Sequence, residues 1–258
     1  MQTNSVTPYS VTAQHAAQPA SSPFSRVQTD LSGGFDKVIS DAMQRGASDD
    51  FVSRLFKNEV RFVQLAEMAS QQQPINSKAF LKNLSYEDRE VLREVHSLAD
   101  YIDDSKVDQM SSEGANNLLR LPHTGLDSDN DGFTDIGIGK TFMFPNSNTP
   151  PGVAEAWNKT TEGMSFKDKM MAKGHLMSSL IMANIETDKN GRFVARHEPG
   201  SPGYVNPFAS ADFSYQKWST DWLRYLEDFK LQMSEDQYSR DKRFFESFLQ
   251  NLKQARVV

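Results

Sequence analysis

Apolar residues recur every three or four positions through most of the chain after residue 34, the spacing that places them on one face of an α-helix. Phe35, Val38 and Ile39 begin this pattern, and Phe51 and Leu55 continue it in the following segment. In this half of the chain the pattern predicts helices over residues 33–44, 49–69, 77–84, 85–102 and 107–121.

The second half shows the same period. It predicts helices over residues 153–159 and 165–186, then a helical hairpin over 209–252. Trp218 and Trp222 lie on one face of the first arm of this hairpin, and Phe245 and Phe248 lie on one face of the second. Because the connection is short, the two helices should be antiparallel and should pack on each other and on helix 165–186.

Methionines are concentrated in and beside helix 165–186, where Leu176 and Leu180 also lie. We expect them to form part of the core stripe of that helix. They are Met164, Met170, Met171, Met177 and Met182.

Three regions follow from these patterns. Residues 1–33 are rich in Ser, Thr, Gln, Ala and Pro without helical or strand periodicity, which predicts a disordered arm. Residues 34–121 form an N-terminal helical region, and residues 122–258 form a loop followed by a C-terminal helical region, as one domain or as two. The fold class is mainly α, with a short β-hairpin at the turn signal Asn190-Gly191.

The loop between the two helical regions carries the clearest chemical signal. Asp127, Asp129, Asp131 and Asp135 are separated so that alternate carboxylates can turn inward, and Gly132 permits a sharp bend among them. Four carboxylates this close together repel one another strongly unless a cation lies between them. A hard cation such as Ca²⁺ prefers six or more oxygen ligands.

This D-x-D-x-D-G-x-x-D pattern resembles the calcium loops of EF-hands and, more closely, those of thrombospondin type 3 repeats. The resemblance covers about nine residues. It departs from an EF-hand at Thr134, where an apolar residue is usual, and at Ile138, where a bidentate glutamate is usual. The resemblance implies a Ca²⁺ site with side-chain ligands Asp127, Asp129, Asp131 and Asp135 and the backbone carbonyl of Phe133.

Two other motifs have simpler explanations. GIGKT, residues 137–141, resembles the end of a phosphate-binding P-loop, but Thr134 stands where the first glycine should be. Glu186, Asp188 and Asn190 repeat the acidic spacing faintly, and we favour a hairpin turn over a second calcium loop there.

Composition limits the remaining choices. The net charge of −6 gives no basic excess for nucleic acid, and no apolar run is long enough to span a bilayer. The absence of cysteine excludes disulfides, thiolate zinc sites and a cysteine nucleophile. The first residues lack the pattern of a secretory signal peptide, so we expect a cytoplasmic protein or one secreted by a leaderless route, since the N-terminus resembles type III export signals.

The sequence therefore predicts a calcium-binding helical interaction protein with a protein partner, exported by a bacterium without a cleaved leader or retained in the cytoplasm. The alternative is a hydrolase whose active-site cleft is braced by a structural calcium loop. Glu113 and Asp108, just before the loop, are the candidate catalytic carboxylates of such a hydrolase.

Overall fold

The computed structural model describes residues 31–44, 46–72 and 76–257. Within them the chain is mainly helical, with ten α-helices and two small antiparallel strand pairs, which confirms the predicted fold class. The first helix begins at Leu31, inside the range expected for the arm, and residues 1–30 of that predicted arm lie outside the described residues. No helix in the described ranges is long and apolar enough to span a bilayer.

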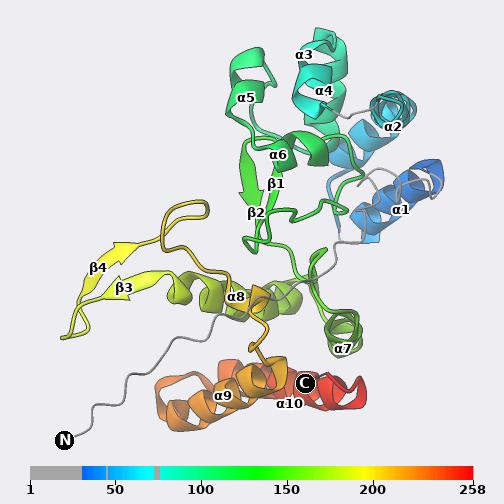
Figure 1. The fold of residues 1–258 in the computed structure, drawn as a ribbon. Helices are drawn as coiled ribbons and strands as arrows, with labels where there is room; N and C mark the ends of the chain where they lie inside the picture. Colours follow the sequence, from blue (N-terminus) through cyan, green and yellow to red (C-terminus); the bar gives the residue numbers. More distant parts are fainter. Residues whose placement is uncertain (1–30, 45, 73–75, 258) are drawn as a thin grey trace, which may run out of the picture.

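Six helices form the first part of the molecule (Figure 1). Most of them are preceded by an N-cap residue whose side chain accepts a hydrogen bond from the backbone N–H three residues later. This bond satisfies one donor of the first turn that would otherwise be unpaired. Their bounds are α1 Leu31–Gln44, α2 Asp49–Ser70, α3 Ser77–Lys82, α4 Tyr86–Val95, α5 Asp104–Gln109 and α6 Ser112–Asn117.

Two of the expected helices are shorter than their apolar patterns. The segment 107–121 contains a helix boundary because Met110 is extended and Ser111 caps a new helix, with its hydroxyl accepting from the Gly114 N–H at 2.8 Å. Helix α4 ends at Val95, and Ile102 reaches the core from the loop that follows it. Apolar spacing therefore marked the buried positions better than it marked the helix ends.

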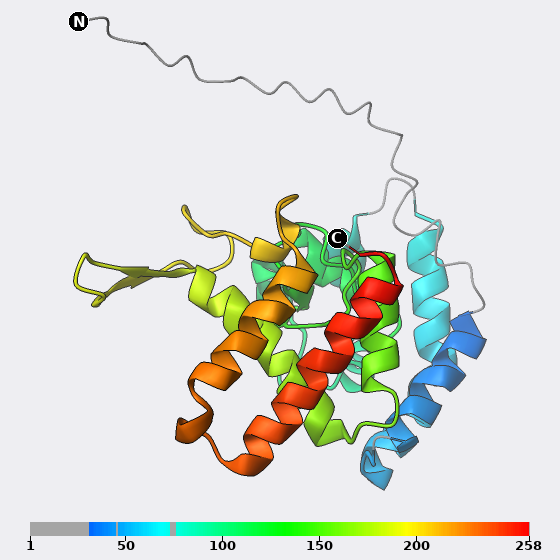
Figure 2. The ribbon, with the colours of Figure 1, turned by 90° about the horizontal axis from the view of Figure 1, so that it is seen from below.

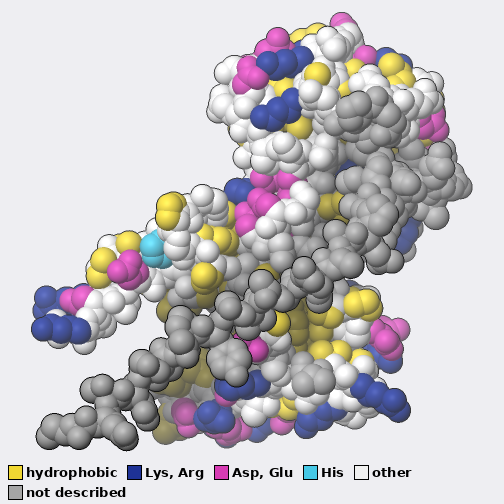
Figure 3. Space-filling model, viewed as in Figure 1, with side chains coloured by type: hydrophobic (Ala, Val, Ile, Leu, Met, Phe, Trp, Pro, Cys, Tyr) yellow, Lys and Arg dark blue, Asp and Glu magenta, His cyan; other side chains and the backbone are white. Residues whose placement is uncertain are grey.

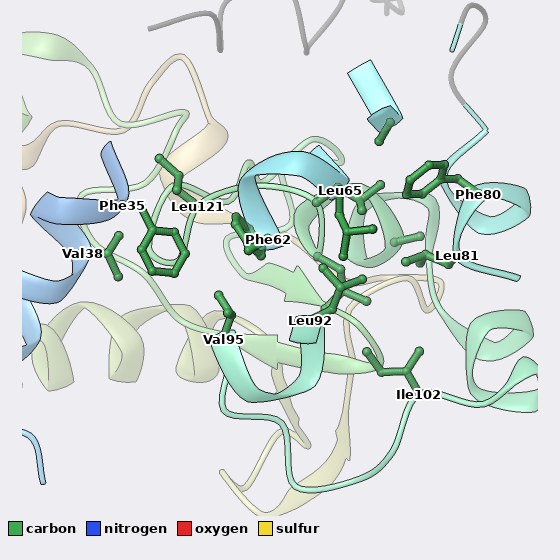
Figure 4. Close-up of a cluster of buried hydrophobic side chains, with 14 of the residues drawn as sticks. Phe35, Val38, Phe62, Leu65, Phe80, Leu81, Leu92, Val95, Ile102 and Leu121 are labelled. Atoms are coloured by element: carbon green, nitrogen blue, oxygen red, sulfur yellow. The ribbon is translucent and has the colours of Figure 1, made fainter. Parts of the chain in front are cut away.

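The N-terminal core lies between these helices (Figure 4). Phe35 from α1 and Phe62 from α2 have ring centroids 5.5 Å apart, and both are fully buried. Leu92 from α4 and Ile102 complete the cluster from the opposite side. One contiguous core thus joins elements from Leu31 to Asn117.

His96 adds a pH-sensitive group to this core. Its ring lies 5.9 Å from Phe62, and its Nε2 is 3.1 Å from the Leu118 carbonyl oxygen. Burial lowers the pKa of His96 from 6.5 to about 4. The neutral ring is therefore the form that the folded protein accommodates.

Lowering the pH is expected to destabilise the protein through His96. The unfolded chain binds this proton below pH 6.5, whereas the folded chain resists it until about pH 4, so stability is full above the unfolded pKa and falls as the pH drops. Between pH 7 and pH 5 this group should remove about 2 kcal/mol of unfolding free energy. In urea titrations at the two pH values, His96→Gln should show a pH difference smaller by about that amount. An unchanged difference would contradict the assignment.

The remaining elements form the second part of the molecule. Figure 2 shows α9 and α10 antiparallel, with α7 alongside α10. This confirms the predicted C-terminal helical hairpin, whose second helix is capped by Ser234 as its sequence indicates. Their bounds are β1 Thr134–Ile136, β2 Gly139–Thr141, α7 Pro151–Thr161, α8 Phe166–Ala183, β3 Ile185–Thr187, β4 Phe193–Arg196, α9 Tyr215–Asp228 and α10 Glu235–Gln254, with short 3₁₀ turns at Pro207–Ala209 and Lys230–Gln232.

A second core lies between α7, α8, α9 and α10 and is rich in aromatic rings. Trp218 is buried against Phe245 and Phe248, and its indole N–H donates to Ser179 Oγ of α8 at 2.9 Å. Trp222 is half-buried and stacks on Phe245.

The prediction for the methionines was wrong in part. Ala172, Leu176 and Leu180 supply the buried stripe of α8, and most of the methionines lie on its other faces. Ala172 and Leu176 pack in the second core, and Leu180 lies beside Gly132 of the aspartate loop. Because these three positions are four residues apart, they form one buried stripe without the larger methionine side chains. The exposed methionines are Met170, Met171, Met177 and Met182.

Strands β3 and β4 project from the end of α8 as a hairpin (Figures 1 and 2). Gly191 has a φ of 75°, and Asp188 Oδ1 accepts from the N–H groups of Asn190 and Arg192 at 2.8 and 2.9 Å. The carboxylate of Glu186 lies 3.5 Å from His197 Nε2 instead of facing Asp188. The hairpin turn accounts for the faint acidic motif at this position.

Candidate metal centre

The aspartate loop lies between the two cores and runs directly into the β1–β2 hairpin (Figure 1). The strands pair so that Asp135 is opposite Lys140 and Ile136 is opposite Gly139. Gly137 has a φ of 62° in the tight turn between them. GIGKT therefore forms a hairpin turn and a strand, which explains its glycines without a bound phosphate.

Within the loop, aspartate side chains accept hydrogen bonds from backbone N–H groups of the same loop. Asp127 Oδ2 accepts from the Gly132 N–H at 3.1 Å, and Asp131 Oδ1 accepts from the Phe133 N–H at 2.8 Å. Asn130 and Gly132 have φ values of 58° and 90°, a region that Asn and Gly tolerate best. The loop thus makes a sharp local turn with its carboxylates at the centre.

Glu113 of α6 contributes a fifth carboxylate to this centre. Its Oε2 accepts from the Ser128 N–H at 2.5 Å, the Ser128 hydroxyl at 2.8 Å and the Asp129 N–H at 3.3 Å. Its Oε1 accepts from the Asp135 N–H at 2.8 Å. Gly114 beside it carries no Cβ because one would lie 2.1 Å from the Gly137 carbonyl oxygen. Helix α6 is therefore fitted closely against the loop.

Glu113, Asp127 and Asp129 each contribute one carboxylate oxygen to a single cluster. These three oxygens lie within 4.8 Å of one another, a spacing that would let a single cation contact all of them. Glu113 and Asp127 are buried, at 5% and 1% exposure, and Asp129 is exposed. The arrangement combines a buried wall with an opening on the Asp129 side.

Asp127 carries the most unusual atom of the cluster. Its Oδ1 is buried and has no hydrogen-bond partner among the described residues. Burial, followed by the neighbouring charge of Glu113, raises the pKa of Asp127 to about 6. A buried carboxylate oxygen without a donor costs stability, and a cation is the partner that would offset this cost most fully.

Asp131 and Asp135 take a different partner. Lys140 Nζ lies 3.1 Å from Asp131 Oδ2 and 2.7 Å from Asp135 Oδ1, and Ser111 Oγ donates to Asp135 Oδ2. Burial alone would lower the pKa of Lys140, but the hydrogen bonds to Asp135 and Asp131 outweigh it and raise the pKa. Figure 3 shows acidic side chains beside a basic one at the middle of the molecule, over the region of β1 and β2.

The structure therefore divides the residues that the sequence grouped together. Asp127 and Asp129 join Glu113, whereas Asp131 and Asp135 bind Lys140. Phe133 lies between Asp131 and Asp135 in the sequence and donates its N–H to Asp131. Sequence spacing could not reveal this division because the two opposing partners, Glu113 and Lys140, are placed by α6 and by the hairpin.

Amide side chains attach the loop to the rest of the molecule. Asn117 of α6 donates to the carbonyl oxygens of Leu126 and Asp135, both at 2.8 Å, and so holds the two ends of the loop together. Asn146 Nδ2 donates to Asp127 Oδ2 at 3.0 Å from the other side. Tyr204 donates its hydroxyl to the Asp131 carbonyl oxygen at 2.6 Å. No spacing in the sequence predicts the contacts of Asn117 and Tyr204, and the pair Asn146 and Asn148 is the visible signal for the contact of Asn146.

Comparison with known proteins adds no relative. No family model, curated protein or solved structure matches this chain.

Proposed function

We propose that this protein is a calcium-binding protein in which one Ca²⁺ ion, held by Glu113, Asp127 and Asp129, fixes the loop between two helical regions. The observation that carries this proposal is the buried Oδ1 of Asp127, which lacks a hydrogen-bond donor, in a residue whose carboxylate is clustered with those of Glu113 and Asp129. Main-chain carbonyls and water would complete the coordination shell, because Ca²⁺ takes six to eight oxygens.

The role of the ion is structural. The loop contacts α6 through Glu113 and Asn117, and it contacts the segment ahead of α7 through Asn146. A cation that neutralises Glu113 and Asp127 would stabilise all of these contacts together. Because Lys140 already binds Asp131 and Asp135, those two carboxylates are less available to the ion, and we expect weak binding.

A dissociation constant on the order of 10⁻⁵ to 10⁻³ M follows, the range of weak sensor sites and extracellular calcium modules. A site at the weak end of this range fills where calcium is millimolar. Millimolar extracellular calcium would fill such a site, so export by a leaderless route is part of this proposal.

An exposed apolar surface supports the proposal of a protein partner. Met182 of α8 and Tyr225 of α9 border a shallow cleft of about 450 Å³ together with Trp222. Phe193 and Val194 on the projecting hairpin are 66% and 53% exposed, and Figure 3 shows hydrophobic side chains along that hairpin. Flexible methionines beside aromatic rings are typical of surfaces that bind other proteins.

Calcium is expected to raise the melting temperature of the native protein. At about a hundredfold excess of calcium over the dissociation constant, binding to the folded state adds about 2.7 kcal/mol, or about 5 to 10 °C. Thermal melts in calcium and in chelator, with a calorimetric titration, measure this directly. Identical melts and no heat of binding at about 0.1 M calcium, a hundredfold excess over the weakest expected dissociation constant, would refute the proposal.

Asp127→Asn gives the sharpest variant for this test. The substitution keeps the shape of the side chain but removes its negative charge, which both burial and the neighbouring Glu113 carboxylate destabilise. In chelator the variant should therefore melt no lower than the native protein. It should also lose the calcium response. Asp188→Asn in the hairpin turn is the matched control, and it should keep the full response because Asp188 lies outside the cluster.

A further inference from the structure

Beside the loop, opposite α6, lies a cleft of about 330 Å³, at the lower end of the range for small-molecule sites. One wall is the loop itself, through Asn130 and Gly132. The other wall comes from the short turn ahead of α9, which includes Phe208 and Ala209. Figure 1 shows the segment between β4 and α9 passing back over α8 before it enters α9.

We propose that this cleft binds a neutral saccharide. None of the described residues that line it carries a charge at neutral pH. Four asparagines supply most of its polar surface, and each amide offers both a donor and an acceptor, which are the two groups that a sugar hydroxyl can bind. They are Asn130, Asn146, Asn148 and Asn206.

The asparagines are held in place by internal hydrogen bonds that leave specific groups free. Asn148 donates to the Asp127 carbonyl oxygen at 2.6 Å and to Asn130 Oδ1 at 3.0 Å, and Asn206 donates to the Asn130 carbonyl oxygen at 2.9 Å. Among the described residues, Asn130 Nδ2 and Asn148 Oδ1 have no hydrogen-bond partner. One ordered donor and one ordered acceptor therefore remain for a ligand.

Tyr215 provides a second polar group. The residue is 4% exposed and lines the cleft, and its hydroxyl makes no hydrogen bond within the described part of the chain. Burial raises the pKa of this hydroxyl, so it remains a neutral donor. Its ring lies nearly parallel to Phe208 at 6.1 Å. Aromatic rings beside amide groups suit a sugar, whose C–H faces pack on rings while its hydroxyls bind amides.

The negative charge of the carboxylates beside the cleft disfavours the binding of acidic ligands. Asn146 in the wall donates directly to Asp127, and the carboxylates of Glu113 and Asp129 lie behind it. A phosphate, sulfate or sialic acid would approach this negative region unfavourably. Because Asn130 belongs to the aspartate loop, we expect saccharide binding to depend on calcium. Only this calcium dependence rests on the proposed function.

The test is binding of the full-length protein to an array of neutral, sialylated and sulfated glycans, in millimolar calcium and in chelator. We expect binding to neutral glycans. Ala209→Trp should fill the cleft and abolish binding, whereas Ala211→Trp, two residues on and outside the lining, should leave it intact. Tyr215→Phe, which removes the hydroxyl alone, should weaken binding of the best glycan about fivefold, and Tyr86→Phe should not.

Each outcome decides a separate point. No glycan binding, a preference for acidic glycans, selective binding of peptides, or binding unaffected by Ala209→Trp would overturn the saccharide proposal. Melts of Ala209→Trp and Ala211→Trp confirm that both variants are folded. Neutral glycan binding that is equal in calcium and chelator, together with melts that ignore calcium, would support the cleft and refute the calcium site.

Discussion

Replacing Phe248 with alanine is expected to lower the free energy of unfolding by about 3–5 kcal/mol, the usual cost of truncating a buried aromatic ring. Phe248 is fully buried on α10 and lies at the centre of the second core. Its ring is 6.1 Å from Trp157 of α7, 6.4 Å from Trp218 of α9 and 5.7 Å from Phe244. Since it contacts rings from three helices, surrounding side chains cannot collapse easily into the space that it leaves.

Gln250→Ala is the matched control, because Gln250 is exposed on the same helix two residues away. It should change stability by less than about 0.5 kcal/mol. Urea denaturation followed by tryptophan fluorescence measures both variants. Equal stabilities would show that α10 does not close this core and would contradict the predicted packing of the C-terminal hairpin.

Periodicity was sufficient to predict the helices but not all of their packing. The α9–α10 hairpin follows from aromatic spacing and a short connection, and the structure confirms it. The methionines of α8 were predicted to be buried, but Ala172, Leu176 and Leu180 form the buried stripe of that helix and most of the methionines are exposed. Side-chain type did not distinguish a core face from an exposed face on a helix that is apolar nearly all round.

The candidate metal centre shows a different limit. Local spacing identified Asp127 and Asp129, which the structure places together. Glu113 is fourteen residues before Asp127. The docking of α6 brings it to the loop, through the bond from the Gly137 N–H to the Gly114 carbonyl oxygen and through the bonds of Asn117 to the two ends of the loop. A contact made by tertiary packing leaves no fixed spacing in a single sequence.

Glu113→Ala is expected to destabilise the protein by about 3–5 kcal/mol even in chelator, because it leaves the buried Asp135 N–H and the part-buried donors of Ser128 and Asp129 without this acceptor. Two effects oppose each other at this residue. Glu113 accepts hydrogen bonds from the N–H groups of Ser128, Asp129 and Asp135 and from the Ser128 hydroxyl, and bonds to a charged group contribute roughly 1.5–3 kcal/mol each. It also repels Asp127, whose nearest carboxylate oxygen lies within 4.8 Å, at a cost of roughly 1–4 kcal/mol.

Since the lost hydrogen bonds together outweigh the single repulsion, the net effect should be a loss of stability. Glu113→Gln separates the two terms: it keeps an acceptor oxygen and removes the charge, so it should fall between Glu113→Ala and the native protein in chelator. Both variants should bind calcium more weakly. Glu246→Ala, an exposed glutamate on α10, controls for the general loss of a carboxylate. If Glu113→Ala were more stable than the native protein in chelator, repulsion would dominate, and Glu113 would be present for a cation rather than for the fold.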